Sequence, residues 1–384
     1  MIPYGRQSIS EDDIAAVVEV LRSPLITQGP VATRFEQTVA EYCGADYAVA
    51  VANGTAALHV AVMALGLGPG GLLWTSPNTF VASANCARYV GADVDFVDID
   101  PATLNMSVEA LAAKLEAAER LGRLPDVVVP VDFAGVSCDM AAIRDLADRY
   151  GFRILEDASH AIGGRYRDEP VGSCRYSDVV TFSFHPVKII TSGEGGMVLT
   201  NDEGIAERAR RLHTHGITRE TSLMRGESDG PWSYQQLELG FNYRITDIQA
   251  ALALSQMSRL DAFVARRNEI AARYREAFSG MPVRCQEVPA DTLSAYHLFV
   301  IELERHDRAA VYDRLREHGV GSAVHYIPVH LQPYYRDLGF ERGDFPNAEA
   351  YYERAITLPC YPDLTEEEQD VVVSGLRRAL ESDA

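Results

Sequence analysis

Lysine is almost missing from this sequence. Of its 35 lysine and arginine residues only two, Lys114 and Lys188, are lysines. Arginine fills every other such position, but it cannot replace lysine where an uncharged amine must attack a carbonyl, because the guanidinium group stays protonated. The two lysines are therefore the first candidates for covalent chemistry.

Positive charge is also scarce overall. The chain has 55 acidic residues and a formal net charge of −20. This balance argues against sequence-independent binding of nucleic acid or of an anionic membrane surface. We expect neither partner, and we expect any anionic ligand to be held by local hydrogen-bond donors.

Several sequence signals are lacking. No apolar run reaches the roughly 18 residues of a membrane helix, and the opening MIPYGRQSISEDDI has neither a basic leader nor an apolar core, so no secretory signal is expected. The six cysteines are scattered without the close pairs of zinc or redox sites. We predict reduced thiols, no metal and a cytoplasmic protein. Nucleotide sites of the P-loop or Rossmann type are not expected.

A chain of 384 residues exceeds the size of one hydrophobic core. We predict a large domain at 1–260 and a smaller α+β domain at 261–384. Short β-branched runs alternate with helical stretches between residues 28 and 202, which indicates an α/β fold with a mixed, mostly parallel sheet between helices. The expected strands cover residues 47–52, 93–99, 126–133, 153–158, 178–184 and 196–201, and in the second domain 297–303 and a stretch near 322–326.

Helical patterns fill the intervals between these strands. Ser107 is a plausible N-cap for the helix that carries Lys114, which we interpret as a solvated surface lysine. A long helical pattern runs from 245 to 278 and crosses into the second domain.

Lys188 lies between an expected strand and the glycine-rich TSGEGG, where the backbone can approach a ligand closely. Five residues earlier, Ser183 is either an ordinary strand-end serine or a hydroxyl donor to the same ligand. A lysine in this context is a candidate for a Schiff base.

Asp157 also ends an apolar run. If its strand and that before Lys188 are parallel, both residues emerge at the carboxyl edge of one sheet, where ligands bind in open α/β folds. A buried carboxylate there needs a cation, and a protonated pyridine nitrogen would serve, as in pyridoxal chemistry. A helix-capping or salt-bridged aspartate would show the same pattern. His160, nearby, is more often a packing histidine than a catalytic one.

A third segment, YAVAVANGTAALH, predicts a strand running into an apolar helix. The amides of Gly54, Thr55 and Ala56 at its N-terminus form a ready anion site. An ordinary strand-to-helix turn explains the same residues.

Together these segments resemble the DegT/DnrJ/StrS family of sugar aminotransferases, which have the fold of type I pyridoxal 5′-phosphate (PLP) enzymes. The resemblance covers almost the whole chain. Eight segments carry it: ITQGP (26–30), NGTAALH (53–59), SPNTFVASANC (76–86), EDASHAIGG (156–164), TFSFHPVKIITSGEGG (181–196), LHTHGI (212–217), LGFNYRITDIQAALALSQ (239–256) and HYIPVHLQPYY (325–335).

The resemblance implies a role for each matching residue. Lys188 would form the Schiff base with PLP, and Asp157 would pair with its pyridine nitrogen. Phe80 would stack on the ring, with His160 near the phenolic oxygen. The phosphate would be held by Thr55, Ala56 and Ser183. Asn242 would come from the partner subunit, which implies a homodimer with composite sites.

The implied reaction moves an amino group from L-glutamate through pyridoxamine 5′-phosphate (PMP) to a keto sugar linked to a nucleotide. Some dehydratases of the family have histidine in place of the lysine, so Lys188 indicates transamination. The first residues, LITQGP, HTHGI and HYIPVHLQPYY resemble the branch that aminates UDP-2-acetamido-2,6-dideoxy-β-L-arabino-hexos-4-ulose, in pseudaminic acid biosynthesis.

Candidate substrate contacts are Gln28, Arg244, Tyr326 and His330. Packing at a domain junction explains Tyr326 and His330 equally well, and Arg244 either faces a diphosphate or braces Asn242. Sister enzymes act on UDP-4-keto-pentoses or on dTDP-3- or 4-keto-6-deoxyhexoses. The sequence is also compatible with a keto-cyclitol or amino acid aminotransferase, with a lyase and with a non-catalytic regulator, although a regulator would be expected to have lost the lysine or the aspartate.

Overall fold

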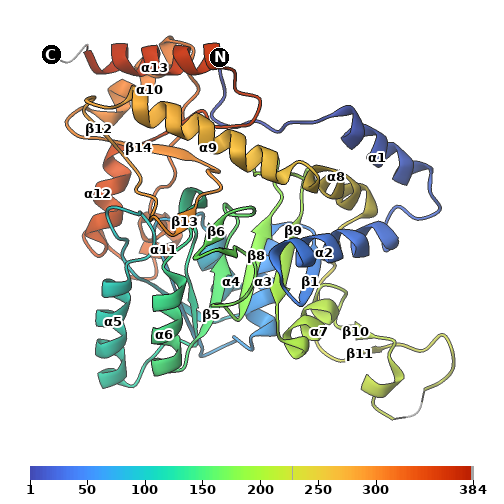
Figure 1. Cartoon of the computed structure of the whole chain (residues 1–384). Coiled ribbons are helices and arrows are strands. Elements are labelled where there is room, and N and C mark those ends of the chain that lie inside the picture. The colour runs from blue at the N-terminus through green and yellow to red at the C-terminus, as the bar shows by residue number, and fades with distance from the viewer. Residues whose placement is uncertain (227, 382–384) are drawn as a thin grey trace.

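The computed structural model describes residues 1–226 and 228–381 (Figure 1). Within them the central sheet has seven strands, and only β9 runs in the direction opposite to the other six. The predicted mixed, mostly parallel α/β fold is thereby confirmed. The strands lie in the order β1 (Tyr47–Val51), β9 (Gly196–Thr200), β8 (Val179–Ser183), β5 (Arg153–Asp157), β4 (Val127–Val129), β2 (Leu72–Thr75) and β3 (Asp93–Phe96).

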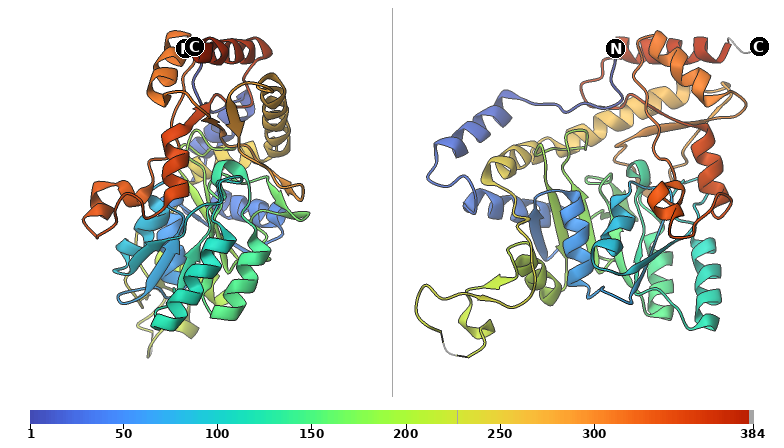
Figure 2. Two further views of the ribbon diagram at one scale, coloured as in Figure 1. Left: turned by 90° about the vertical axis from the view of Figure 1, so that its left-hand side faces the viewer. Right: turned by 180° about the vertical axis from the view of Figure 1, so that it is seen from behind.

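Alternate residues of each strand enter different cores, because neighbouring side chains point to opposite faces of a sheet. In β8, Val179 packs in the core shared with α3, α4 and α7, whereas Val180 packs with α2 and α8. Helices α5 and α6 cover the rest of that second face (Figures 1 and 2). The helices are α1 (Glu11–Arg22), α2 (Pro30–Cys43), α3 (Gly54–Ala64), α4 (Ala82–Tyr89), α5 (Val108–Leu121), α6 (Met140–Tyr150), α7 (Glu203–Leu212) and α8 (Asp247–Met257).

The C-terminal part has its own core and an antiparallel sheet in the order β12–β14–β15. The first residues of the chain join it, since Ile2 pairs with Val320 beside α13 (Figure 1). Its elements are α9 (Leu260–Ala277), β12 (Val283–Cys285), β14 (Phe299–Leu303), α10 (Arg308–Glu317), α11 (Pro333–Arg336), α12 (Pro346–Arg354), β15 (Ala355–Leu358) and α13 (Glu366–Glu381).

Short elements connect these layers. A hairpin of β10 and β11 extends from the body of the protein after α7 (Figure 1). The short elements are β6 (Arg165–Tyr166), β7 (Glu169–Pro170), β13 (Thr292–Leu293), β10 (Ile217–Thr218), β11 (Gln235–Gln236) and the 3-10 turns Phe133–Gly135, Thr221–Leu223 and Val329–Leu331.

Some predicted elements differ from the structure. The strand expected near 322–326 is wrong: Ala323 makes only an isolated bridge to Thr357. The long helix pattern from 245 breaks at residues 258–259, between α8 and α9. Strands β2 and β15 were missed, because a strand of four residues is too short to show a helix or strand periodicity. The division at residue 260 stays a prediction.

One motif was also missed. The letters GLGPGG at 66–71 match G-x-G-x-x-G. A dinucleotide site would place them after a strand and before a helix. Here they follow α3 and precede β2. The turn therefore leads from a helix to a strand, the reverse of the order in a dinucleotide site.

The second lysine has a structural role. Lys114 Nζ pairs with Asp95 at 2.7 Å, donates to the Phe96 carbonyl and lies 5.0 Å from the centre of the Trp74 ring. Lys114 therefore forms an ion pair with a residue of β3, whereas the sequence had indicated a solvated side chain.

The six cysteines of the described chain are free thiols. Among the described residues, no helix combines the length and the apolarity needed to span a membrane.

Candidate active site

Asp157 and Lys188 leave the sheet at the same edge. Asp157 ends β5, Ser183 ends β8, and the two strands pair in parallel with Asp157 opposite Thr181. The parallel pairing on which the prediction depended is thus present. Lys188 follows in the loop 184–195, which we call the lysine loop, and the chain returns as β9.

Two opposing effects set the charge of Lys188. Burial lowers the pKa of its amine to about 8, while the negative charge of Asp157 acts to raise it. Desolvation is the larger effect because the protein interior solvates an ammonium group poorly. Near neutral pH a usable fraction of the amine is therefore uncharged and nucleophilic.

Asp157 is a buried carboxylate with several hydrogen-bond donors. It is 5% exposed. Ser83 Oγ donates to Oδ2 at 2.7 Å, and Ser159 donates to Oδ1 from its hydroxyl at 2.6 Å and its amide at 3.2 Å. These donors fix the plane of the carboxylate. Sequence reasoning missed both serines, although each lies in a matched segment. Ser159 is close to Asp157 in the sequence, but nothing in the local sequence indicates that Ser83, on α4, reaches Asp157.

His160 is oriented by a backbone amide. The N–H of Ala134 donates to its Nδ1 at 3.2 Å, and its Nε2 lies 3.2 Å from the Tyr326 hydroxyl. Since an amide can only donate, Nδ1 carries a lone pair and Nε2 carries the proton. The Tyr326 oxygen then accepts a hydrogen bond from the Nε2–H group, and its own O–H is free to point elsewhere. Burial, together with the nearby charge of Lys188, holds the pKa of His160 well below 6.5.

Two further histidines surround this pair. The rings of His297 and His160 have centroids 4.4 Å apart, and burial lowers the pKa of His297 well below its usual value. His325 Nδ1 lies 2.8 Å from Thr357 Oγ1, and burial lowers its pKa to about 4. All three imidazoles are neutral near pH 7. His297 and His325 were missed as site residues. His297 lies in none of the matched segments, and His325 opens the matched segment HYIPVHLQPYY but was given no role.

The N-terminus of α3 lies against Ser183. A Cβ atom added to Gly54 would be 2.8 Å from Ser183 Cβ, so the two segments are in close contact. The Ala56 amide, which was predicted to hold the phosphate, here donates to the side chain of Asn53, the N-cap of the helix, at 2.8 Å. The Gly54 and Thr55 amides, in the first turn, are the remaining donors for an anion at this end, together with the Ser183 hydroxyl.

The other predicted residues lie around this centre or apart from it. Phe80 is 57% exposed, with its ring centroid 6.2 Å from that of Tyr326. Asn242 is exposed and pairs with Thr214. Arg244 pairs with Val51, at the end of β1 just before α3.

Gln28 is exposed, with a φ of 54°. The neighbouring Thr27 pairs with Thr246 and brings Gln28 towards the segment of Asn242 and Arg244. His330 is separate: it is fully buried, bonds Glu349 at 2.9 Å and packs on Phe345. This position favours the packing interpretation of His330.

The sequence matches a known family along most of its length. The profile of the DegT/DnrJ/EryC1/StrS aminotransferase family matches residues 7–377. The chain belongs to this family. The predicted family and enzyme class, an aminotransferase, are thus confirmed.

Curated relatives extend over the whole chain. The spore coat polysaccharide biosynthesis protein SpsC of Bacillus subtilis is 40% identical over 383 residues, which cover 98% of this chain and 96% of SpsC. Among solved structures, the putative sugar aminotransferase Spr1654 of Streptococcus pneumoniae, in its PMP form, has a TM-score of 0.90 at 28% identity and full coverage of both chains. It was also solved in a PLP form, in agreement with the cofactor predicted here.

Helicobacter pylori PseC, an aminotransferase of pseudaminic acid biosynthesis, is a further structural neighbour. It has a TM-score of 0.89 at 28% identity, with 99% of each chain covered. The fold of this chain is therefore that of these sugar aminotransferases.

We predict that His160 stays neutral, with its proton on Nε2, throughout the range from pH 6 to 8. The reasons are burial and the amide of Ala134 facing Nδ1. Nitrogen NMR of the histidine-labelled chain checks this, with His160→Gln to assign the signal. An imidazolium signal at pH 6, or a proton on Nδ1, contradicts the hydrogen-bond assignment.

Proposed function

We propose that this chain transfers an amino group from L-glutamate to the 4-keto carbon of a UDP-2-acetamido-2,6-dideoxy-hexose, with PLP bound covalently to Lys188. The observation that carries the proposal is the Lys188 amine, whose pKa desolvation lowers to about 8, at the same sheet edge as the buried Asp157. The product would be an amino sugar for a bacterial surface polysaccharide.

The site residues fit PLP at both of its charged ends. The Gly54 and Thr55 amides and the Ser183 hydroxyl supply donors for a phosphate. Asp157 supplies a fixed anion for a pyridinium nitrogen, and the exposed face of Phe80 supplies a surface for the ring. The neutral Tyr326–His160 pair offers one O–H donor for a phenolate oxygen.

When bound, the cofactor supplies the electron sink that stabilises negative charge on a carbon atom. The proton transfers belong to Lys188. In the first half-reaction its Nζ accepts the proton from Cα of the amino donor, and in the second it removes and delivers protons in the reverse order on the keto sugar. Positioned transfers of this kind contribute about 10² to 10⁴-fold in rate.

The substrate assignment is supported by similarity to surface-sugar proteins. PseC acts in pseudaminic acid biosynthesis and SpsC in spore coat polysaccharide biosynthesis, by their names. The candidates for contact with the nucleotide sugar are Tyr326 beside His160, and Gln28 and Arg244 near the start of α3.

A homodimer with shared sites is supported by exposed apolar surface. Ile14 and Leu21 of α1 and Leu25 and Ile26 after it are each about half exposed, at 48%, 56%, 51% and 49%. A second copy covering them would remove apolar surface from water. Asn242 is exposed, as a residue that reaches into a partner would be, and lies two residues before Arg244, which pairs with Val51 near the start of α3.

The attachment of PLP is tested by borohydride reduction and peptide mass spectrometry. We expect the reduced adduct on Lys188 alone, because the pKa of its amine is lowered to about 8, whereas Lys114 is held in an ion pair. Lys188→Ala should lose both the adduct and turnover, and the matched variant Lys114→Arg should keep both. An adduct on Lys114 refutes the assignment.

The substrate is tested by a panel of keto sugars. We expect the UDP-2-acetamido-2,6-dideoxy-4-keto hexose to be aminated with the highest kcat/KM, and NMR of the product to place nitrogen at C4. Faster amination of a UDP-4-keto-pentose, a dTDP-keto-6-deoxyhexose or a keto-cyclitol would contradict the proposed substrate. It would not contradict the assignment of Lys188.

The composite site is tested by mixing two inactive variants. If Asn242 acts across the interface, co-refolded Lys188→Ala and Asn242→Ala chains form heterodimers with one intact site each. Random pairing then restores about a quarter of the wild-type activity. Activity no higher than that of the separate variants would place Asn242 in its own subunit's site, or outside it.

A further inference from the structure

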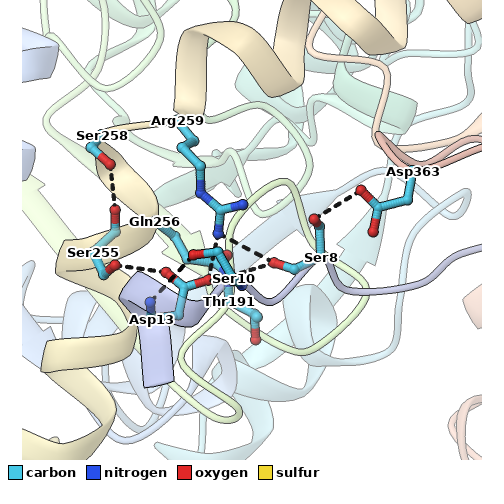
Figure 3. Close-up of polar contacts among 9 residues, drawn as sticks. All are labelled: Ser8, Ser10, Asp13, Thr191, Ser255, Gln256, Ser258, Arg259 and Asp363. Atoms are coloured by element: carbon cyan, nitrogen blue, oxygen red, sulfur yellow. Dashed lines mark hydrogen bonds and ion pairs between the residues drawn. The ribbon is translucent and has the colours of Figure 1, made fainter. Parts of the chain in front are cut away.

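A buried glutamine links the lysine loop to the N-terminal segment, which we define as residues 2–10. Gln256, on α8, is 1% exposed. Its Oε1 accepts the Thr191 amide at 3.0 Å, and its Nε2 donates to the Ser8 carbonyl at 2.8 Å and to Asp13 Oδ2 at 3.2 Å (Figure 3). The contacts to Ser8 and Asp13 join residues 248 and 243 positions apart in the sequence.

Thr191 is the residue through which this contact reaches the lysine loop. Its hydroxyl donates to the Phe184 carbonyl at 2.9 Å and accepts from the Gly193 amide at 2.9 Å. The Ser192 amide also bonds the Phe184 carbonyl. The two ends of the loop are thus closed around Thr191, three residues from Lys188. A shift of Thr191 would therefore move the backbone that carries Lys188.

Asp13 fixes the orientation of the Gln256 amide. It is 1% exposed and is bonded by Ser255 Oγ at 2.7 Å, by the Ser10 amide at 2.9 Å and by the Arg259 guanidinium. Burial acts to raise the pKa of Asp13, but these donors together lower it. Because an ionised carboxylate only accepts, the NH2 group of Gln256 must face it, which leaves Oε1 for Thr191.

The N-terminal segment passes over the same loop. A Cβ atom on Gly5 would lie 3.5 Å from Val187 Cβ, and the Tyr4 ring lies 5.3 Å from that of His325. Ser8 also donates to Asp363 at 2.9 Å, in the C-terminal part. The segment therefore contacts both the residue before Lys188 and the part of the chain that carries His325.

We propose that Gln256, oriented by Asp13, is a positioning residue for Lys188, and that it makes the placement of the lysine loop depend on the N-terminal segment. A side chain with one donor end and one acceptor end is needed here, which neither an apolar residue nor an ionised carboxylate supplies. The inference rests on the assignment of Lys188 made above.

The test is Gln256→Glu, which keeps the size and the acceptor but places an anion against Asp13. At pH 8 we expect kcat to fall about 10- to 100-fold, as for a misplaced catalytic group, with a smaller change in KM. In the chain without cofactor, amide hydrogen exchange of residues 184–195 should be faster. As pH falls towards 6 the new carboxyl group protonates and can donate to Asp13 or Ser8, so the ratio of variant to wild-type kcat should rise.

The matched control is Gln369→Glu. Gln369 is also 1% exposed and donates to a carbonyl, that of Ile270, but it lies in α13. It should lower stability without changing kcat or the exchange of the lysine loop. If Gln256→Glu fails to fold, the double variant Asp13→Asn and Gln256→Glu, which exchanges amide and carboxylate, should fold and recover part of the kcat. The new amide can donate to the new carboxylate, but the Ser8 carbonyl still loses its donor from residue 256.

Three results would overturn the proposal: wild-type kcat and loop exchange in Gln256→Glu, an equal loss of kcat in Gln369→Glu, or a double variant that recovers nothing. A wrong assignment of Lys188 gives a different result, since borohydride would then fail to label Lys188 in the wild-type chain. If only the role of Gln256 is wrong, labelling at Lys188 succeeds in the wild-type and variant chains alike.

Discussion

The interaction on which the site depends is the balance between burial of the Lys188 amine and the charge of Asp157. Burial favours the neutral amine and the carboxylate favours the ammonium, and the outcome is a pKa of about 8. A stronger ion pair would keep the lysine protonated and inert. If no carboxylate lay near the Lys188 amine, the site would have no anion to balance the charge of a pyridinium nitrogen.

The fold produces this balance through strand direction. β5 and β8 are parallel, so Asp157 and Ser183 end at one edge, and β9 turns back antiparallel so that the lysine loop stays over that edge. The same edge receives the N-terminus of α3, because Gly54 packs against Ser183. Cation, anion and phosphate donors are thus gathered by one sheet, while neutral histidines fill the space around them without adding charge.

Much of this arrangement could be predicted from the sequence, where the signal is local. Lys188 and Asp157 each follow an apolar strand, and a single lysine beside a glycine-rich turn is conspicuous in a chain of arginines. The position of Ser107 as an N-cap was also right, since its side chain accepts from the Ala110 amide. The eight matched segments identified the family directly.

What could not be predicted depends on contacts between distant residues. Ser83 reaches Asp157 from 74 residues away, and Gln256 meets Asp13 across 243. Periodicity carries no information on such pairs, and a buried glutamine inside an apolar helix is indistinguishable from a surface one. The strand LLWT (72–75) was missed because it is too short to show alternation, although it lies inside the sheet.

The central claim is tested most directly by titrating the Lys188 amine in the cofactor-free chain. With only two lysines, nitrogen NMR of ε-15N-lysine-labelled protein gives two signals, and Lys114→Arg assigns them. The account predicts that the Lys188 signal titrates near pH 8, and at lower pH in Asp157→Asn, because the carboxylate no longer stabilises the ammonium. A Lys188 amine that titrates at the ordinary value of 10.5, unchanged by that substitution, would contradict it.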